Sequence, residues 1–511
     1  MENLIEERLH LILKKRYVLV LFVILFLTLD SLVFILPYYL KGYTIPVGWD
    51  TPWYIRNMRL IEEQGFYSFF IKTHGINLFS ILEYLFASAF NISFILTETI
   101  VPIMIGLLFP LVNFQIVKKL TRSQKLALVA MLFTIIDYNT VRMTGLLHRN
   151  LFCFLLIEIA TFLVLPGFLA KPSKKRFFIF VLLLVMAGLS QMETFAIAVF
   201  MLSISLIFYL KKRLLKTAKL LLLCVFTPAL IVMLFEAPFF PTFMRGHVVF
   251  NPAVRWYRQN FIADWWYYLA SFGAGLIPLY IVGMCHLLKK TVKNLEKYQC
   301  LFISLWNVIV IACSFLPVFG VRAPGWRFLI LATVPPVATL GFVKLFLEKG
   351  SFTKKKALIL VALIAVSLIA IIVNQSRSYR PWISENEYRK LMRISNANQH
   401  GSNIIFVLSL DKSTYTFELA ELYRHWIWAV VGTRTNVYFG DIKCLIESQP
   451  TDFENQFLNS TSHIFWNELE DFTLNNARIY TIEEWYENLL NETHLVEVEP
   501  ESGIYFMELD Q

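Results

Sequence analysis

The sequence predicts a polytopic α-helical membrane protein of about eleven transmembrane helices, followed by an extracytoplasmic α/β domain. Hydrophobic residues make up 57% of the 511-residue chain and charged residues only 16%, whereas soluble globular proteins carry about 25% charged residues. Apolar runs long enough to cross about 30 Å of hydrocarbon recur between residues 17 and 374. Residues 377–511 have no such run and hold 21 acidic against 10 basic residues. We therefore divide the chain into a transmembrane domain, 1–374, and a C-terminal domain, 375–511.

Lysine-rich clusters between the apolar runs predict which side of the membrane each loop faces. They lie at 14–16, 118–125, 171–176, 211–219, 289–297 and 344–356, and such clusters mark cytoplasmic ends. The segment 77–95 contains Glu83 and several small polar residues, so we interpret it as an amphipathic helix in the outer interface rather than a span. The predicted spans are 17–40, 96–117, 124–138, 150–170, 177–192, 194–210, 217–236, 264–288, 298–320, 327–347 and 356–374.

An odd number of spans from a cytoplasmic N-terminus places the C-terminal domain on the extracytoplasmic side. We expect a multi-pass protein of the plasma membrane, or of the endoplasmic reticulum in a eukaryote. The first outer loop, 41–95, then faces the same side as the C-terminal domain.

The later outer loops contain seven arginines and no lysine. They are Arg142, Arg149, Arg245, Arg255, Arg258, Arg322 and Arg327. Positive charge on this side opposes the orientation rule, and a guanidinium binds phosphate oxygens in a two-pronged geometry that lysine cannot match. The seven arginines together therefore favour an anionic ligand. A single one of them can equally form a salt bridge within its loop, or lie at a helix end and snorkel to the membrane interface.

The first outer loop contains the stretch "GWDTPWYI", residues 48–55, which predicts the start of a helix. Thr51 is a suitable N-cap, Pro52 suits the first helical position and Gly65 suits the end. Asp50 would lie at the positive end of the helix dipole, which favours an ionised carboxylate. The alternative is that Asp50 only caps the helix.

This acid-bearing first loop with an aromatic-rich amphipathic helix resembles the integral-membrane glycosyltransferases of the GT-C fold class. That class includes oligosaccharyltransferases, protein mannosyltransferases and lipid-A aminoarabinose transferases. Further segments are similar to family loops: 77–95, 137–150, 188–196 and 320–336. The resemblance implies a GT-C-like transmembrane domain in which Asp50 is either the catalytic base or a group that binds a metal and the acceptor.

Two departures from the family pattern limit what the resemblance implies. His148, Arg149 and Asn150 stand where oligosaccharyltransferases have acidic metal ligands, and the tail has no WWDYG-like sequence. We therefore assign no metal and no oligosaccharyltransferase activity. His148 and His247 are an alternative pair of metal ligands, but their spacing matches no defined metal motif.

A sugar transfer on the outer side needs a donor that arrives through the membrane, because nucleotide sugars are cytoplasmic. A polyprenyl-phosphate-linked hexose or pentose meets this need. Asp50 would deprotonate the acceptor hydroxyl, and a single base without a second carboxylate nucleophile implies inversion. We assign the donor phosphate to Arg142, Arg149, Arg255, Arg258, Arg322 and Arg327. We assign the acceptor, a protein, lipid or glycan, to Trp49, Trp53, Glu193 and His148. The other partners are membrane lipids, and no nucleic acid is expected.

A secondary transporter or an exporter of lipid-linked saccharide is the rival class. Asp30 and Glu158 lie inside predicted spans, where ionisable residues are costly and often functional. The sequence has no internal repeat and no matched pair of broken helices, so we favour the enzyme.

The C-terminal domain alternates predicted strands with predicted helices. The strands are 403–410, 435–440, 462–467 and 477–482, the helices 416–432 and 481–490, and a hairpin closes the chain at 494–509. The domain is either a structural cap or part of the acceptor site. Asn374, Asn459 and Asn491 begin N-x-S/T sequons that could carry glycans.

Overall fold

The computed structural model consists of two compact units. Met1–Gly48 and Tyr67–Arg380 form the helical unit, and Trp49–Phe66 and Pro381–Gln511 form the C-terminal unit. The structure describes residues 16–48, 50–73, 75–239, 269–271, 273–293, 298–316, 326–348, 353–377, 381, 383, 385–397, 404–408, 425–432, 436–439, 478–480, 495–499 and 504–507. The predicted division assigned the whole first loop to the transmembrane domain, whereas residues 49–66 cluster here with the tail.

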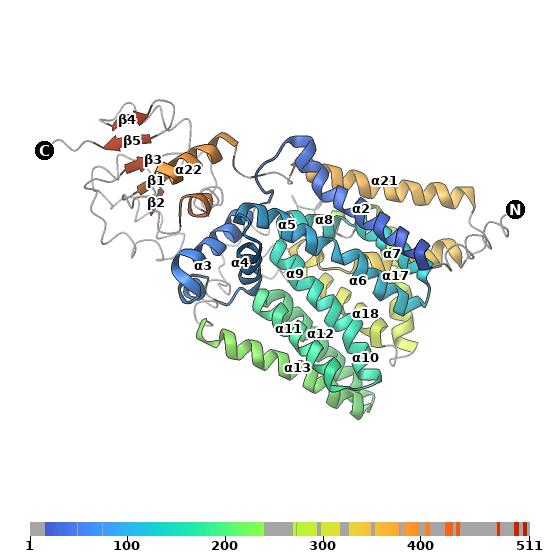
Figure 1. Ribbon diagram of the computed structural model, residues 1–511. Helices are drawn as coiled ribbons and strands as arrows, with labels where there is room; N and C mark the ends of the chain where they lie inside the picture. Colours follow the sequence, from blue (N-terminus) through green and yellow to red (C-terminus); the bar gives the residue numbers. More distant parts are fainter. Residues whose placement is uncertain are drawn as a thin grey trace. The chain divides into compact units, whose positions relative to one another are not determined.

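The helical unit is a bundle of helices (Figure 1). Its described helices are α2 (Arg16–Lys41), α4 (Leu78–Phe90), α5 (Phe94–Gly106), α6 (Leu108–Thr121), α7 (Gln124–Ile135), α8 (Tyr138–Leu146), α9 (His148–Ile157), the π-helix η1 (Glu158–Val164), α10 (Leu165–Ala170), α11 (Lys174–Ser190), α12 (Met192–Lys211), α13 (Leu215–Glu236), η2 (Ala237–Phe239), η3 (Ala274–Leu276), α17 (Ile277–Lys293), α18 (Tyr298–Cys313), α19 (Trp326–Leu329), α20 (Val334–Phe342), η5 (Val343–Leu347) and α21 (Lys354–Arg377).

The described residues include six helical stretches that are long and apolar enough to cross a membrane. They are Tyr17–Lys41, Phe94–Thr121, His148–Ala170, Met192–Lys211, Leu215–Phe239 and Lys354–Ser376. The pair α7 and α8, bent by 49°, makes a seventh if it is one span. The chain is thus a multi-pass membrane protein, and the number eleven stays a prediction. Because α4 has 13 residues, it is about 20 Å long and too short to span, as expected for segment 77–95.

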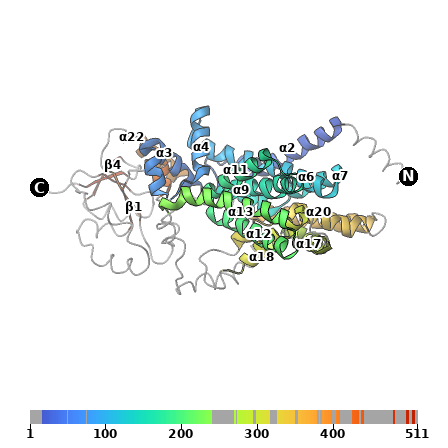
Figure 2. The same ribbon diagram turned by 90° about the horizontal axis from the view of Figure 1, so that it is seen from below.

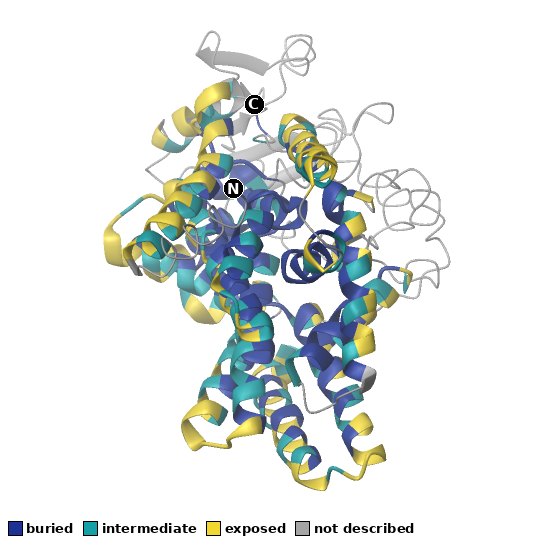
Figure 3. Cartoon of the chain, turned by 90° about the vertical axis from the view of Figure 1, so that its right-hand side faces the viewer, coloured by how far each residue is buried: buried dark blue, intermediate teal, exposed yellow. Residues whose placement is uncertain are grey.

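Buried residues lie inside the bundle, and exposed residues lie mainly on its outer surface (Figure 3). The helices α17 and α20 lie side by side (Figure 2) and touch through backbone atoms. A Cβ added to Gly283 would lie 2.0 Å from the Val337 carbonyl oxygen, and one added to Gly341 would lie 1.8 Å from that of Leu279. Small residues allow such close helix contacts in membranes.

Side chains of neighbouring helices hydrogen-bond to backbone groups where helices are irregular. Gln299 donates to the Phe162 carbonyl at 3.0 Å and Lys119 to the Leu163 carbonyl at 3.0 Å, both in η1. Trp306 Nε1 donates to the Leu331 carbonyl at 2.7 Å, in the non-helical stretch before α20. Buried backbone groups need such partners.

The first-loop helix is α3 (Thr51–Lys72), and it is broken at Gly65, where φ is 76° and ψ is 171°. The predicted end at Gly65 is therefore a break, after which the helix resumes.

The amides of Trp53 and Tyr54 donate to the Asp50 carbonyl at 3.1 and 3.2 Å. The helix cap is thus Asp50 rather than Thr51, one residue earlier than predicted. The boundary between the two units follows the break by one residue.

The described strands of the C-terminal unit form one five-stranded sheet in the order β2-β1-β3-β5-β4. They are β1 (Ile404–Leu408), β2 (Asn436–Phe439), β3 (Arg478–Tyr480), β4 (Leu495–Glu499) and β5 (Ile504–Met507), and α22 (Glu385–Ala397) precedes them. β1 is parallel to β2 and β3, while β5 pairs antiparallel with β3 and β4. Four predicted strand regions coincide with described strands. The predicted strand 462–467 and helix 481–490 lie outside the described residues, and a separate α/β domain stays a prediction.

The sequon at Asn374 is not available for glycosylation, contrary to our expectation. Asn374 lies inside α21 with 5% of its surface exposed, and its Oδ1 accepts a hydrogen bond from the Tyr138 hydroxyl at 3.4 Å. A buried side chain in a helix cannot reach a glycosylating enzyme. Asn459 and Asn491 lie outside the described residues.

Candidate functional site

Asp50 is positioned by the start of α3 in the C-terminal unit. Its side chain is half-buried, and its backbone carbonyl makes the first helical hydrogen bonds. The free amides and the dipole at this helix end favour a negative charge. Trp53, one turn along, is half-buried and meets Tyr54 edge-on with 5.3 Å between the ring centroids. Trp49 lies outside the described residues.

The helix that follows Asp50 packs against the tail within the C-terminal unit. The Arg56 guanidinium lies 4.5 Å from the ring centroid of Trp428, a cation–π contact. A Cβ added to Gly432 would lie 3.3 Å from Glu63 Oε1, so the same stretch of tail also approaches the end of this helix. These contacts explain why residues 49–66 belong to the unit formed by the tail.

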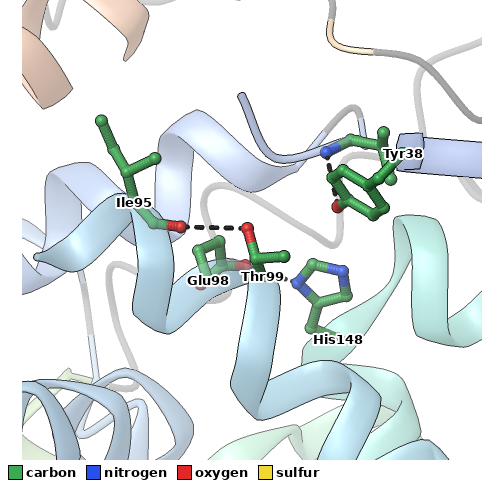
Figure 4. Close-up of polar contacts among 6 residues, drawn as sticks. Tyr38, Ile95, Glu98, Thr99 and His148 are labelled. Atoms are coloured by element: carbon green, nitrogen blue, oxygen red, sulfur yellow. Dashed lines mark hydrogen bonds and ion pairs between the residues drawn. The ribbon is translucent and has the colours of Figure 1, made fainter. Parts of the chain in front are cut away.

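A buried acid–histidine pair lies at one end of the helical unit, where α5 meets α9 (Figure 4). His148 Nδ1 and Glu98 Oε1 are 2.5 Å apart, with 2% of His148 and 1% of Glu98 exposed. His148 begins α9, and Glu98 lies in the first turns of α5, whose N-cap Ser93 accepts from the Leu96 amide at 3.2 Å. His148, which we assigned to the acceptor, is thus packed against Glu98.

A second buried acid, Glu83 of α4, lies beside this pair and is fully buried. Burial first, and then the neighbouring Glu98 carboxyl, raise the pKa of Glu83 well above its usual range. Two adjacent carboxylates cannot both ionise in a buried site, so Glu83 keeps its proton while Glu98 faces the imidazole. Glu83 therefore does not lie on a water-facing side of α4, as an amphipathic interfacial helix would require.

The arginines assigned to the donor phosphate are not gathered at one place by the described residues. Arg142 of α8 is 5% exposed, and its Nη1 donates to the Tyr138 hydroxyl at 3.2 Å. Arg149 is half-buried in the first turn of α9, and Arg327 is exposed in α19. Arg255, Arg258 and Arg322 lie outside the described residues, as does Arg245.

The remaining predicted acids occupy three different environments. Glu193 is exposed in the first turn of α12. Asp30 and Glu158 are buried in α2 and η1, with 0% and 1% exposed. Both Asp30 carboxylate oxygens lack a hydrogen-bond partner among the described residues. Asp137, the first residue of segment 137–150, caps α8, since its Oδ2 accepts from the Thr140 amide at 3.1 Å.

The described residues offer no group of three or more His, Cys, Asp or Glu side chains that could hold a metal ion. The acid–histidine pair is joined directly, and among the described residues Glu83 is the further acid beside it. His247, our other candidate metal ligand, lies outside the described residues.

No protein-family model matches the chain, and no curated protein matches it in sequence. Solved structures do resemble it. The oligosaccharyltransferase AglB from Archaeoglobus fulgidus, in complex with an inhibitory peptide and a dolichol-phosphate, covers 81% of this chain with a TM-score of 0.52 and 13% identity. A second structure of an A. fulgidus oligosaccharyltransferase, with Zn and sulfate, covers 82% with a TM-score of 0.53 and 13% identity. ArnT from Cupriavidus metallidurans, in the apo state, covers 94% with a TM-score of 0.55 and 10% identity.

The chain has the GT-C fold. This confirms the fold class that the first-loop resemblance implied. The match extends over 97% of ArnT but over only 64% and 62% of the two oligosaccharyltransferase chains. The GT-C chain described here is therefore comparable to ArnT in extent and spans less than two thirds of the archaeal oligosaccharyltransferases.

Sequence reasoning missed Glu98. The residue lies at the third position of the predicted span 96–117, in "LTETIVP", and an acid inside an apolar run is a functional candidate by default. We applied that rule to Asp30 and Glu158 but not to Glu98. Its partner His148 was found, because a histidine in an outer loop stands out in the sequence.

Proposed function

We propose that this GT-C protein transfers a sugar from a polyprenyl-phosphate-linked donor to an acceptor on the extracytoplasmic side of the membrane. The observation that carries the proposal is the combination of the fold with an acid at the start of the first-loop helix. AglB, a structural neighbour, was solved with a dolichol-phosphate. A lipid-linked donor is also consistent with a bundle of apolar helices, because the apolar outer surface of such a bundle can contact a lipid chain.

Asp50 is the base in this proposal. Its carboxylate takes the proton of the acceptor hydroxyl while the acceptor oxygen forms a bond to the anomeric carbon of the sugar. The bond between that carbon and the phosphate oxygen breaks, and the polyprenyl phosphate leaves with the electron pair. Attack from the side opposite the phosphate inverts the anomeric configuration.

The arginines stabilise the leaving phosphate. Arg149 and Arg327 are half-buried and exposed, so a ligand can reach their guanidinium groups. Arg142 is buried against Tyr138, so it supports the fold around the site more directly than it contacts phosphate. Arg255, Arg258 and Arg322 remain proposed phosphate ligands, and Trp49, Trp53, Glu193 and His148 remain proposed acceptor-side residues.

The test uses purified full-length protein in detergent with polyprenyl-phosphate-linked hexose and pentose donors and a membrane extract of the source cells as acceptor. Release of free polyprenyl phosphate, and the mass added to acceptors, are followed by mass spectrometry. The variant Asp50→Asn should lower the rate by roughly 10²- to 10⁴-fold. It should still fold, because the backbone carbonyl of Asp50 starts α3 and the amide has nearly the same volume.

The matched control is Glu62→Gln, an exposed acid on the same helix, which should keep the parent rate. An Asp50→Asn protein that transfers sugar at the parent rate would show that Asp50 is only a helix cap.

The rival function, transport of a lipid-linked saccharide, is supported by the buried Asp30 without a hydrogen-bond partner among the described residues. A transporter needs two compartments and shows no reaction in detergent. Activity that appears only in sealed vesicles, depends on a gradient and is lost in Asp30→Asn would favour this rival.

A further inference from the structure

A short stretch without a regular helix, 330–333, joins α19 to α20, and we call it the α19–α20 turn. Arg327 lies in α19, three residues before this turn, and its side chain is exposed. Every residue of the turn has at most 2% of its surface exposed. Two backbone hydrogen bonds shape the turn, from the Leu331 amide to the Phe328 carbonyl at 3.1 Å and from the Ala332 amide to the Leu329 carbonyl at 2.9 Å. An exposed arginine is thus attached to a segment that is buried in the bundle.

The side-chain amide of Asn307, in α18, holds the end of the turn through two hydrogen bonds. Asn307 Oδ1 accepts from the Thr333 amide at 3.1 Å, and Nδ2 donates to the Thr333 hydroxyl oxygen at 2.6 Å. In a continuous helix the Thr333 amide would donate to the Leu329 carbonyl, but that carbonyl accepts from the Ala332 amide here. Asn307 therefore supplies an acceptor that the helix does not.

Asn307 is itself fixed by the helices around it. Its Oδ1 also accepts from the Tyr280 hydroxyl of α17 at 2.8 Å, and its Nδ2 also donates to the Ile303 carbonyl at 2.8 Å. An asparagine amide has two donor hydrogens and two acceptor lone pairs, so all four are used. The amide has one possible orientation, because the Thr333 amide can only donate and the Ile303 carbonyl can only accept. One buried side chain thus joins α17, α18 and the turn before α20, helices that lie together in Figure 2.

The neighbouring residue, Trp306, holds the turn at a second point. Its Nε1 donates to the Leu331 carbonyl at 2.7 Å. In a continuous helix this carbonyl would accept from the amide of residue 335, but Pro335 has no N–H. The indole is fully buried and stacks on Phe154 of α9 at 5.9 Å between the ring centroids, with Phe162 edge-on at 6.4 Å. Trp306 therefore supplies the missing donor from a rigid position.

We infer that Asn307 and Trp306 are positioning residues for Arg327, because they fix the turn to which the short helix of Arg327 is attached. The inference rests on the proposed function, which assigns Arg327 to the donor phosphate. Neither residue touches the reacting atoms. A fixed turn restricts where the guanidinium can lie, so less order has to be gained when the phosphate binds. Loss of either side chain raises the KM for the lipid-linked donor and leaves kcat unchanged.

Hydrogen exchange of the turn tests the structural step independently of activity. Mass spectrometry on the full-length protein in detergent measures the amides of residues 330–333. Asn307→Leu removes the acceptor of the Thr333 amide and should speed exchange roughly fivefold, the loss of one hydrogen bond. Trp306→Phe keeps an aromatic ring but removes the donor to the Leu331 carbonyl, and it should speed exchange in the same direction.

The matched control is Asn113→Leu. Asn113 is 2% exposed, and its Nδ2 donates to the Thr134 hydroxyl oxygen at 3.1 Å, a contact between the regular helices α6 and α7. Its loss removes a buried asparagine without touching a break in a helix. The variant should change neither the exchange of the α19–α20 turn nor the donor KM.

A double-mutant cycle with Arg327 tests the link to the phosphate. Asn307→Leu should raise the donor KM roughly three- to tenfold, and Arg327→Ala roughly ten- to a hundredfold, the loss of a charged hydrogen bond. If Asn307 acts through Arg327, the double variant should have the KM of Arg327→Ala, because no guanidinium is left to position. Effects that multiply in the double variant would show that Asn307 acts elsewhere.

The remaining outcomes also decide the inference. Unchanged turn exchange in Asn307→Leu and Trp306→Phe overturns it, and so does a lower kcat at normal donor KM. Trp306→Phe replaces Asn307→Leu in the cycle should the latter not fold. If the parent transfers no sugar but binds polyprenyl phosphate, the proposed function fails, and the same cycle measured as the Kd for polyprenyl phosphate tests the positioning. A parent protein that binds no polyprenyl phosphate overturns both.

Discussion

At the lysine-rich end of the helical unit, charged side chains lie at or near the surface, whereas at the opposite end three ionisable side chains, Glu83, Glu98 and His148, are buried. Lys119 and Arg176 are exposed and cap backbone carbonyls, at 3.0 Å from Leu163 and 2.5 Å from Gly167. Glu98 and His148 are almost fully buried and bind each other. Surface charges cost little to place, while buried ones need specific partners.

This difference shows at which end of the unit the burial of ionisable side chains costs free energy. Orientation in the membrane explains the lysines without any ligand. It does not explain why three ionisable groups, Glu83, Glu98 and His148, are buried at the other end. Four variants test this contrast between the two ends.

The variant His148→Ala should lower the free energy of unfolding by about 3–5 kcal/mol, because it leaves the Glu98 carboxylate buried without its imidazole partner. Reversible unfolding in mixed micelles of detergent and dodecyl sulfate measures the change. His286, half-buried at the lysine-rich end, is the matched control. His286→Ala should cost less than about 0.5 kcal/mol, and equal losses for both histidines would abolish the contrast between the ends.

The variant Gly341→Ala should cost about 1–3 kcal/mol, because the new methyl group meets the Leu279 backbone of α17 at 1.8 Å. Gly341 lies three residues before Lys344, so this loss would show that packing rather than charge holds the lysine-rich end. Gly167→Ala is the control, since its nearest neighbour would be Arg176 Nη1 at 3.6 Å, an ordinary contact. That variant should be neutral or slightly stabilising in the same micelle titration.

The variant Arg327→Lys should raise the KM for the lipid-linked donor about tenfold with little change in kcat, because a charge survives but the two-pronged contact to phosphate is lost. Lys344→Arg, at the lysine-rich end, should leave both constants unchanged. Steady-state kinetics with varied donor measure this. A normal donor KM in Arg327→Lys removes that residue from the phosphate site.

The variant Glu83→Gln should alter how stability depends on pH. The raised pKa of Glu83 means that its contribution is fully present below about pH 4.5, the ordinary pKa of glutamate, and is lost as pH rises through the folded-state pKa. Glutamine does not titrate, so the variant should gain a few degrees of apparent Tm over the parent at pH 8 and less at pH 5. A constant difference between the two pH values contradicts a protonated Glu83. The exposed Glu348 provides the control, and Glu348→Gln should show no such gain.

Much of the fold follows from local properties of the chain. Apolar runs predicted the helices of the bundle, and Thr-Pro predicted the start of α3, because span length and backbone propensity depend on neighbours in sequence. Gly65 was predicted to end α3, whereas it only breaks the helix. The cap was misplaced by one residue, since Asp50 and Thr51 are both good caps and only the hydrogen bonds distinguish them. The sequon at Asn374 was misjudged, because its accessibility depends on the packing of α8 against α21.

The candidate site was only partly predictable for the same reason. Asp50 and His148 are easily recognised in their outer loops. Glu98 lies inside an apolar run, and its contact is with His148, fifty residues away in the sequence.

By itself, the sequence determined that the chain is a multi-pass helical membrane protein, and the motif around Asp50 indicated the GT-C fold. Both conclusions rest on hydropathy and on short-range sequence patterns, which can be recognised without knowledge of tertiary contacts. The tertiary structure alone decided that residues 49–66 cluster with the tail, that Glu83, Glu98 and His148 are buried close together, and that the Tyr38 hydroxyl accepts a hydrogen bond from the Val47 amide. Those features come from pairs distant in sequence, and only packing brings such pairs together.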